Sequence, residues 1–217
     1  MHLQAILERR RRPERTAVIL TRVEVDSEDD GFHWPTKPVG PVLAADIVMT
    51  ADWDIAQTVH GPRRVVASPK PLHIIDLDVI KRLVELNAVV ICGGGGGVPT
   101  ARLNQHLQGM PAVIDKDLFS SLLARELEAH ALIISTESGA IYRGFGTDNA
   151  EALSTLTVAE ARSMEEAGEF PPGSMAPKVN ALCEFSQHSD AAKALLCAPG
   201  DVLLALRGER GTNITRS

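Results

Sequence analysis

Short apolar runs alternate with longer amphipathic segments along this chain. Four runs rich in valine and isoleucine and bounded by breakers predict strands: TAVILTRVEV (16–25), AVVIC (88–92), PAVI (111–114) and HALIIST (130–136). Apolar residues at three- and four-residue spacing predict helices at 74–87 and 117–130. Two further helices are predicted at 157–168, where Thr157 and Glu160 form a capping-box pattern and Gly168 marks the end, and at 173–189.

This order of strands and helices predicts an α/β fold. Strands that alternate with helices form a mostly parallel sheet whose two faces are covered by the helices. The 217 residues, 44% of them hydrophobic, suffice for one compact domain with a sizeable core or for two small lobes. In such sheets, ligands bind beyond the carboxyl ends of the strands. Loops that directly follow a predicted strand are therefore the first candidates for a site.

The charge balance and the cysteines narrow the class of protein. A net charge of −6 argues against general affinity for nucleic acid or an anionic membrane, and a solvated helix end explains the run Arg9–Arg12 most simply. No apolar stretch approaches membrane-spanning length, and at the start the charges follow the apolar residues, the wrong order for a signal peptide. The three cysteines, Cys92, Cys183 and Cys197, lack metal-ligand spacing. We therefore expect a cytoplasmic protein with buried thiols and with neither nucleic acid nor membrane as a partner.

Five consecutive glycines, Gly93 to Gly97, directly follow the predicted strand 88–92. Glycine at this position allows backbone N–H groups to approach phosphate oxygens, because no Cβ stands in the way. The loop is neither a Walker loop, since no Lys-Ser or Lys-Thr follows, nor an ordered Rossmann fingerprint, since Val98-Pro99 interrupts it. A flexible or tightly turned connection remains the alternative to an anion site.

Charged residues also stand between the predicted strand 111–114 and the helix after it. Asp115 and Asp117 flank Lys116, an arrangement that could orient the lysine toward a transferring phosphoryl group. A solvated turn is the alternative interpretation, and Asp117 also suits the cap of the following helix.

A third candidate segment is FPPGSMAPKVNA, residues 170–181. Pro171-Pro172-Gly173 predicts a turn, Ser174 a helix N-cap, and Lys178 then lies on the first turn of a helix, where the helix dipole disfavours a cation. An anion held at that helix start would explain the lysine. A surface lysine whose long stem reaches water is the alternative.

Taken together, these segments resemble the carbamate kinases, members of the amino acid kinase family. The resemblance is carried by WPTKPVG (34–40), SPKP (68–71), GGGGGVP (93–99), IDKD (114–117), FPPGSMAPK (170–178) and the closing ALRGERGTNI (205–214). These motifs stand in the family's order over nearly the whole chain.

The resemblance implies a fold and an activity. The fold would be an open αβα sandwich around a mainly parallel sheet, a single domain over 1–217 with a small excursion near 26–67 over the substrate site. The activity would be reversible phosphoryl transfer between carbamoyl phosphate and ADP, giving ATP and carbamate, with Mg²⁺. Such a phosphotransferase, which acts on a carboxyl-group acceptor, would work as a cytoplasmic homodimer in a pathway such as arginine metabolism.

The resemblance also implies roles for particular residues. Lys116 and Lys178 would neutralise the transferring phosphoryl group, Asp117 would hold these lysines and lie near Mg²⁺, and Lys37 would sit on the excursion over the carbamoyl phosphate site. Phosphate and nucleotide contacts would come from Gly93, Gly94, Gly95, Gly96, Glu137, Tyr142, Gly146 and Met175. Most of the nucleotide contacts would thus lie in STESGAIYRGFGT (135–147).

The sequence departs from the family's pattern in several places. Family members open with a strand and a GGNA-type loop that binds the phosphoryl and carbamate groups, whereas this sequence starts within LQAILERRRR, which matches a later helix. Smaller departures are the fifth glycine, Ala176 in place of glycine, and Glu137-Ser138 where an aspartate is expected. We therefore expect an amino-terminally truncated kinase domain. The alternative is an inactive pseudokinase that binds nucleotide or a partner without turnover.

Overall fold

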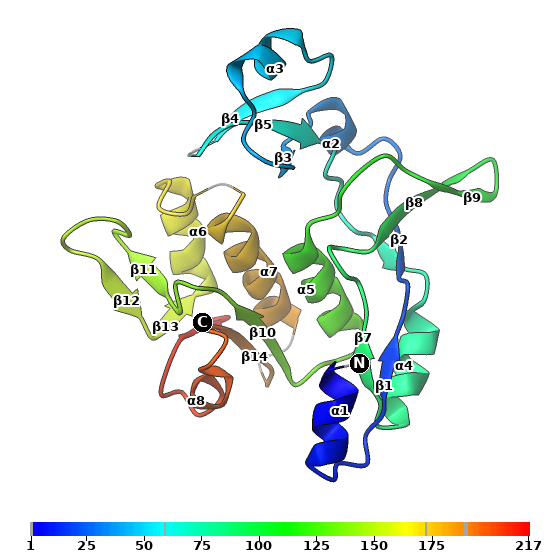
Figure 1. The fold of residues 1–217 in the computed structure, drawn as a ribbon. Coiled ribbons are helices and arrows are strands. Elements are labelled where there is room, and N and C mark those ends of the chain that lie inside the picture. The colour runs from blue at the N-terminus through cyan, green and yellow to red at the C-terminus, as the bar shows by residue number, and fades with distance from the viewer. Residues whose placement is uncertain (1, 59, 172, 189–190) are drawn as a thin grey trace. The chain divides into compact units, whose positions relative to one another are not determined.

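The computed structural model describes residues 2–58, 60–171, 173–188 and 191–217. The chain forms two compact units, residues 1–119 and 120–217 (Figure 1). Each unit combines helices with open sheets of mixed direction, so the α/β class predicted from the sequence is confirmed. Among the described helices, none is both long enough and apolar enough to cross a membrane.

The first unit contains a parallel strand pair, a mixed sheet and a small antiparallel sheet. Its helices are α1 (His2–Arg9), α2 (Asp30–His33), α3 (Ala45–Thr50) and α4 (Leu77–Glu85), and α5 (Lys116–Glu126) begins at its end. Its strands are β1 (Thr16–Val18), β2 (Arg22–Glu24), β3 (Lys37–Val39), β4 (Ile55–Thr58), β5 (Gly61–Val66), β6 (His73–Ile74), β7 (Val89–Ile91), β8 (Val98–Leu103) and β9 (His106–Gly109).

The strand predicted over 16–25 is two strands, because the chain changes partners within it. β1 pairs in parallel with β7, whereas β2 pairs in parallel with β8 and antiparallel with β6. Between them, the buried Thr21 accepts a hydrogen bond from the backbone N–H of Val98 through its carbonyl oxygen (2.8 Å). The segment from β1 to β2 therefore runs alongside the segment from β7 to β8, and the glycine loop lies between the latter two strands.

Residues 111–114 form no strand, so the strand predicted there is a wrong prediction. The segment is extended but joins no ladder, since Pro111 has no N–H to donate and the N–H of Val113 donates instead to the carbonyl of Ala67 (2.9 Å). This bond ties the segment before α5 to the end of β5.

The excursion predicted near 26–67 contains a small antiparallel sheet that the apolar pattern did not indicate. Its strand order is β3-β5-β4, and Lys37 on the edge strand β3 pairs with Val66 on β5. Figure 1 shows this sheet with α3 beside it, standing away from the β2-β8 sheet of the same unit. The excursion thus projects Lys37 from an ordered strand.

The second unit is built around a four-stranded sheet of order β10-β14-β15-β13. Its further helices are α6 (Val158–Glu166), α7 (Met175–His188) and α8 (Val202–Leu206). Its strands are β10 (Ala131–Ser135), β11 (Ile141–Arg143), β12 (Glu151–Leu153), β13 (Thr155–Thr157), β14 (Lys193–Cys197) and β15 (Thr212–Thr215).

Strand β14, one of the two inner strands of this sheet, is buried on both faces. Residues 194–197 of β14 are all buried, as expected for a strand with helices on each side. Leu195 and Cys197 pack against Ala205 of α8, and α7 also contacts β14 (Figure 1). This unit therefore has the helix–sheet–helix layering that the sequence predicts.

The predicted helices all occur, with small shifts at their ends. The capping box at Thr157 is present, since its hydroxyl oxygen accepts from the N–H of Glu160 while the Glu160 carboxylate accepts from the N–H of Thr157. The fourth predicted helix is α7, and the predicted end at 189 lies outside the described residues, as does Pro172 of the predicted turn.

Candidate active site

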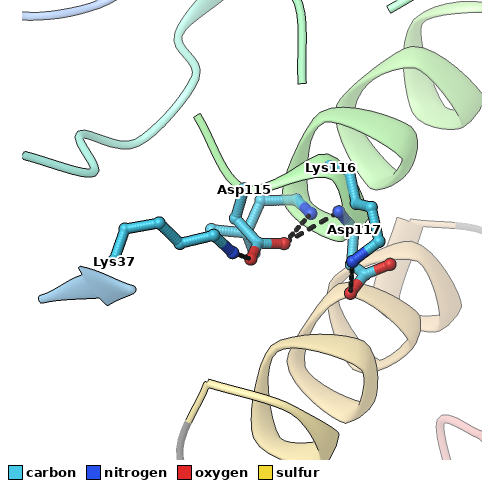
Figure 2. A network of polar contacts seen from close by, with 5 residues as sticks. Lys37, Asp115, Lys116 and Asp117 are labelled. Carbon is cyan, nitrogen blue, oxygen red and sulfur yellow. Dashed lines mark hydrogen bonds and ion pairs between the residues drawn. The ribbon is translucent and has the colours of Figure 1, made fainter. Parts of the chain in front are cut away.

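Two lysine–aspartate pairs gather at the start of α5. The ammonium group of Lys37 donates to Oδ2 of Asp115 across a sequence separation of 78 residues, and Nζ of Lys116 lies 3.4 Å from Oδ2 of Asp117 (Figure 2). Both aspartate side chains are 8% exposed, whereas the lysine side chains are 22% and 57% exposed for Lys37 and Lys116. The carboxylates thus form the buried side of the cluster, and the ammonium groups are the more accessible part.

The cap of α5 is Asp115, not Asp117 as the sequence suggested. Its Oδ1 accepts from the N–H of Asp117 (2.8 Å) and, at 3.4 Å, from the N–H of Leu118 (Figure 2). Asp117 lies inside the first helical turn and cannot cap it. Capping through Asp115 leaves the side chain of Asp117 available for the ammonium group of Lys116.

Asp115 is held in its ionised form. Burial on its own would raise the pKa of this carboxyl group, but the hydrogen bonds from Lys37 and from the N–H of Asp117, with the charges of Lys37 and Lys116, hold the pKa below its ordinary value. A buried carboxylate at neutral pH requires such partners. Asp115 therefore meets the ammonium group of Lys37 as a carboxylate.

The glycine loop packs against this cluster. A Cβ at Gly93 would overlap the ring of Phe119 on α5, and one at Gly96 would overlap the carbonyl oxygen of Ile114, the residue before Asp115. Both glycines also have positive φ angles, +73° and +131°. The loop is therefore tightly turned, as the predicted alternative allowed, and it is turned against the start of α5.

The middle of the loop faces open space. No atom lies within 4 Å of a Cβ built at Gly94 or Gly95. The ends of the loop are closed by hydrogen bonds, from the N–H of Gly96 to the carbonyl of Gly93 (2.7 Å) and from the N–H of Gly93 to Oγ1 of Thr21 (2.9 Å). An anion could approach the backbone at Gly94 and Gly95, because nothing but glycine hydrogens covers it there.

Sequence reasoning missed two residues of this site. Asp115 was recognised only as a flanking carboxylate, and its pairing with Lys37 could not be read from residues so far apart. Thr21 carried no signal at all, since a threonine within an apolar run is ordinary in a strand. The structure brings Lys37, Lys116, Asp117 and the predicted glycines together in the first unit.

The remaining predicted site residues lie in the second unit. Lys178 is on the first turn of α7, which begins at Met175, as predicted. Glu137 is exposed in the turn after β10, and Gly146 is exposed in the loop between β11 and β12. Tyr142 is on β11 with its ring centroid 5.8 Å from that of Phe145. The roles of these residues stay predictions.

A hollow of about 530 Å³ lies elsewhere in the first unit, between residues 13–15 and 84–89. These residues precede β1 and β7 or open β7, so the hollow lies at the amino ends of the two strands. Ligands of parallel sheets bind at the opposite, carboxyl end, where the glycine loop lies. We therefore assign the site to the loop and the lysine–aspartate pairs.

A family model decides the classification. The model described as the amino acid kinase family matches residues 25–195, which include the excursion, the glycine loop and both lysine–aspartate pairs. The chain belongs to the amino acid kinase family. Within this family, 93% of the chain aligns with the carbamate kinase of Halobacterium salinarum at 41% identity and with that of Rhizobium meliloti at 44% identity.

A solved structure of the same family has the same fold. The carbamate kinase from Giardia lamblia bound to AMP-PNP is 33% identical, covers 98% of this chain and superimposes with a TM-score of 0.86. The chain spans 69% of that protein, and 67% and 63% of the Halobacterium and Rhizobium proteins. This amino acid kinase family member thus covers about two thirds of the length of the relatives that it matches.

Proposed function

We propose that the chain is a carbamate kinase, which transfers a phosphoryl group reversibly between carbamoyl phosphate and ADP. In the direction of ATP synthesis, the bond between phosphorus and the carbamate oxygen breaks as a β-phosphate oxygen of ADP bonds to the phosphorus. The products are ATP and carbamate. The observation that carries the proposal is the pair of buried carboxylates that hold two more exposed ammonium groups beside an open glycine backbone.

This arrangement suits phosphoryl transfer for an electrostatic reason. The transition state spreads negative charge over the phosphoryl oxygens, so catalysis depends mainly on positioned positive charge rather than on covalent chemistry. Lys37 and Lys116 would supply that charge from opposite sides of Asp115, and the backbone N–H groups at Gly94 and Gly95 would add donors. Lys178 is the third cation that we propose for the reaction, acting from the start of α7.

Magnesium fits this site as a substrate-borne ion. No group of three or more potential ligand side chains forms in the described part of the chain, but Asp117 offers one carboxylate. Mg²⁺ commonly binds through one or two carboxylates, substrate phosphates and water. When bound with ATP or ADP, the ion would neutralise phosphate charge.

The further properties that we propose come from the family. The protein would bind ATP or ADP through residues 135–147 and Met175, function as a cytoplasmic homodimer and serve arginine metabolism or a related pathway. The dimer is tested by sedimentation of the purified chain.

The activity is tested by ATP formation from carbamoyl phosphate, ADP and Mg²⁺, with a mock-purified control. We expect Lys116→Ala and Lys178→Ala each to lower kcat by roughly two to three orders of magnitude, the usual cost of a lost transition-state donor. Lys81→Ala, on α4, a helix that contributes no residue to the cluster, is the matched control and should leave the rate unchanged. A folded chain that binds nucleotide but makes no ATP would contradict the proposal and favour a pseudokinase.

A further inference from the structure

A side-chain ion pair joins the excursion to the start of α5. Lys37 stands on β3, the edge strand of the excursion's sheet, and its ammonium group reaches Asp115 outside that sheet. The backbone bond from Val113 to Ala67 ties the same two regions two residues before Asp115. The ion pair therefore adds a second attachment, made by β3, next to the first one, because Lys37 pairs with Val66, the residue before Ala67.

The two carboxylate oxygens of Asp115 have different partners. Oδ1 accepts backbone N–H groups of α5, and Oδ2 accepts the ammonium group of Lys37 (Figure 2). The first interaction fixes the carboxylate on a rigid helix end. The second fixes the terminal atom of a long side chain that otherwise has four rotatable bonds and considerable conformational entropy to lose.

A lysine held in this way is already placed for an anion. Its ammonium group has three donors, and Asp115 uses one of them, so others remain for phosphoryl oxygens. Pre-organisation lowers the entropic cost of binding and keeps the charge where a transition state needs it.

We propose that Asp115 is a positioning residue for Lys37, and that it holds the excursion's lysine beside the glycine loop for the carbamoyl phosphate end of the reaction. This inference rests on the proposed function. It adds a residue that acts through Lys37 and does not itself touch the substrate.

The variant Asp115→Asn separates the two tasks of the side chain. Asparagine keeps a carbonyl oxygen that can cap α5 about as well as aspartate, but its amide cannot replace the carboxylate as the partner of an ammonium group. The matched control is Asp76→Asn, because Asp76 stands at the start of α4 and pairs with Arg22 in the same unit.

The first measurement is hydrogen exchange of the free protein by mass spectrometry. Asp115→Asn should speed the exchange of the β3 and β5 amides by on the order of tenfold, because a lost attachment lowers the local opening energy. Asp76→Asn should leave these amides unchanged. Unchanged exchange in Asp115→Asn, or an equal increase in both variants, would overturn the attachment.

The second measurement is a double-mutant cycle on the kinetics. Asp115→Asn should raise KM for carbamoyl phosphate or lower kcat by on the order of tenfold, with KM for ADP unchanged. In a Lys37→Met background, Asp115→Asn should have no further effect. Additive effects of the two substitutions would overturn the inference, since Asp115 would then act without Lys37.

The two measurements distinguish the inference from the proposed function. If the wild-type chain folds but makes no ATP, the proposed function fails. The exchange of β3 and β5 still decides whether Asp115 holds the excursion. If the chain is active and the kinetic effects add, the function stands and the positioning role is wrong.

Discussion

Single residues decide the charge that the site presents. The cluster of Lys37, Asp115, Lys116 and Asp117 has no net charge, yet its carboxylates are buried and its ammonium groups are more exposed. Since charges near the surface interact with a ligand more directly than those behind them, an approaching anion meets the lysines first. Exposure, and not the sum of charges, therefore supports the phosphate site that we propose.

The pH dependence of stability follows from Asp115. Its pKa is lower in the folded protein than the ordinary value of 3.8, so its ion pair and cap stabilise the fold above pH 3.8 and lose that contribution as the pH falls through the folded pKa. Asp115→Asn should therefore lower the free energy of unfolding by roughly 1 to 3 kcal/mol at pH 7. Urea unfolding at pH 7 and pH 3 would measure this, and the difference between the proteins should shrink at pH 3. An equal difference at both pH values would contradict the assignment.

At this scale the sequence supplied residue types but not their pairing. The lysines and Asp117 could be nominated because they follow a predicted strand or belong to family motifs. Lys37 and Asp115 meet because β3 pairs with the end of β5, where the segment before α5 is also bonded, and no local pattern encodes that contact. The sequence also could not tell which aspartate caps α5. Asp115 and Asp117 both have the side chain that a cap requires, so Asp117 was predicted in place of Asp115.

At the scale of elements, the glycine loop divides into positions that need glycine and positions that do not. Gly93 has a positive φ and lies against Phe119, whereas Gly95 has neither constraint. Gly93→Ala should destabilise the protein by roughly 2 kcal/mol or more, because strain and overpacking both apply. Gly95→Ala should have little effect on stability and should instead raise KM for the phosphate substrates. Thermal unfolding and steady-state kinetics of the two variants test this, and equal loss of stability would refute the division.

Elements with strong periodicity were the ones that the sequence could predict. The helices that begin at Leu77 and Val158 show the expected spacing or capping box. The excursion's sheet was missed because its strands carry prolines and charges in place of alternating apolar residues. The segment 111–114 looked like a strand because of its apolar residues, yet strand formation also requires a partner with free backbone groups.

At the scale of the whole molecule, the three cysteines differ in exposure between the two units. Cys92 is partly exposed in the first unit, whereas Cys183 and Cys197 are buried in the second. Burial raises the pKa of Cys183 to about 11, and burial also raises the pKa of the other two thiols. The second unit therefore protects its thiols both from contact with reagents and from ionisation.

We expect the native protein to react with a thiol reagent first at Cys92. At pH 8, a thiol with the pKa of Cys183 has about 100-fold less thiolate than one at its ordinary pKa of 9.0, and only the thiolate is nucleophilic. Mass spectrometry of the labelled native protein checks the order, and Cys92→Ser should remove the fast phase. Labelling of Cys183 or Cys197 as fast as that of Cys92 would show that the second unit opens readily.

The open middle of the glycine loop also makes the protein suitable for spectroscopic observation. Gly95 has no neighbour within 4 Å of a built Cβ, so a cysteine placed there in a Cys92→Ser background has room for an environment-sensitive fluorophore. The buried Cys183 and Cys197 would contribute little background labelling. Such a probe would stand in the middle of the glycine loop, and its emission would report whether an anion still reaches the loop there, without any need for turnover.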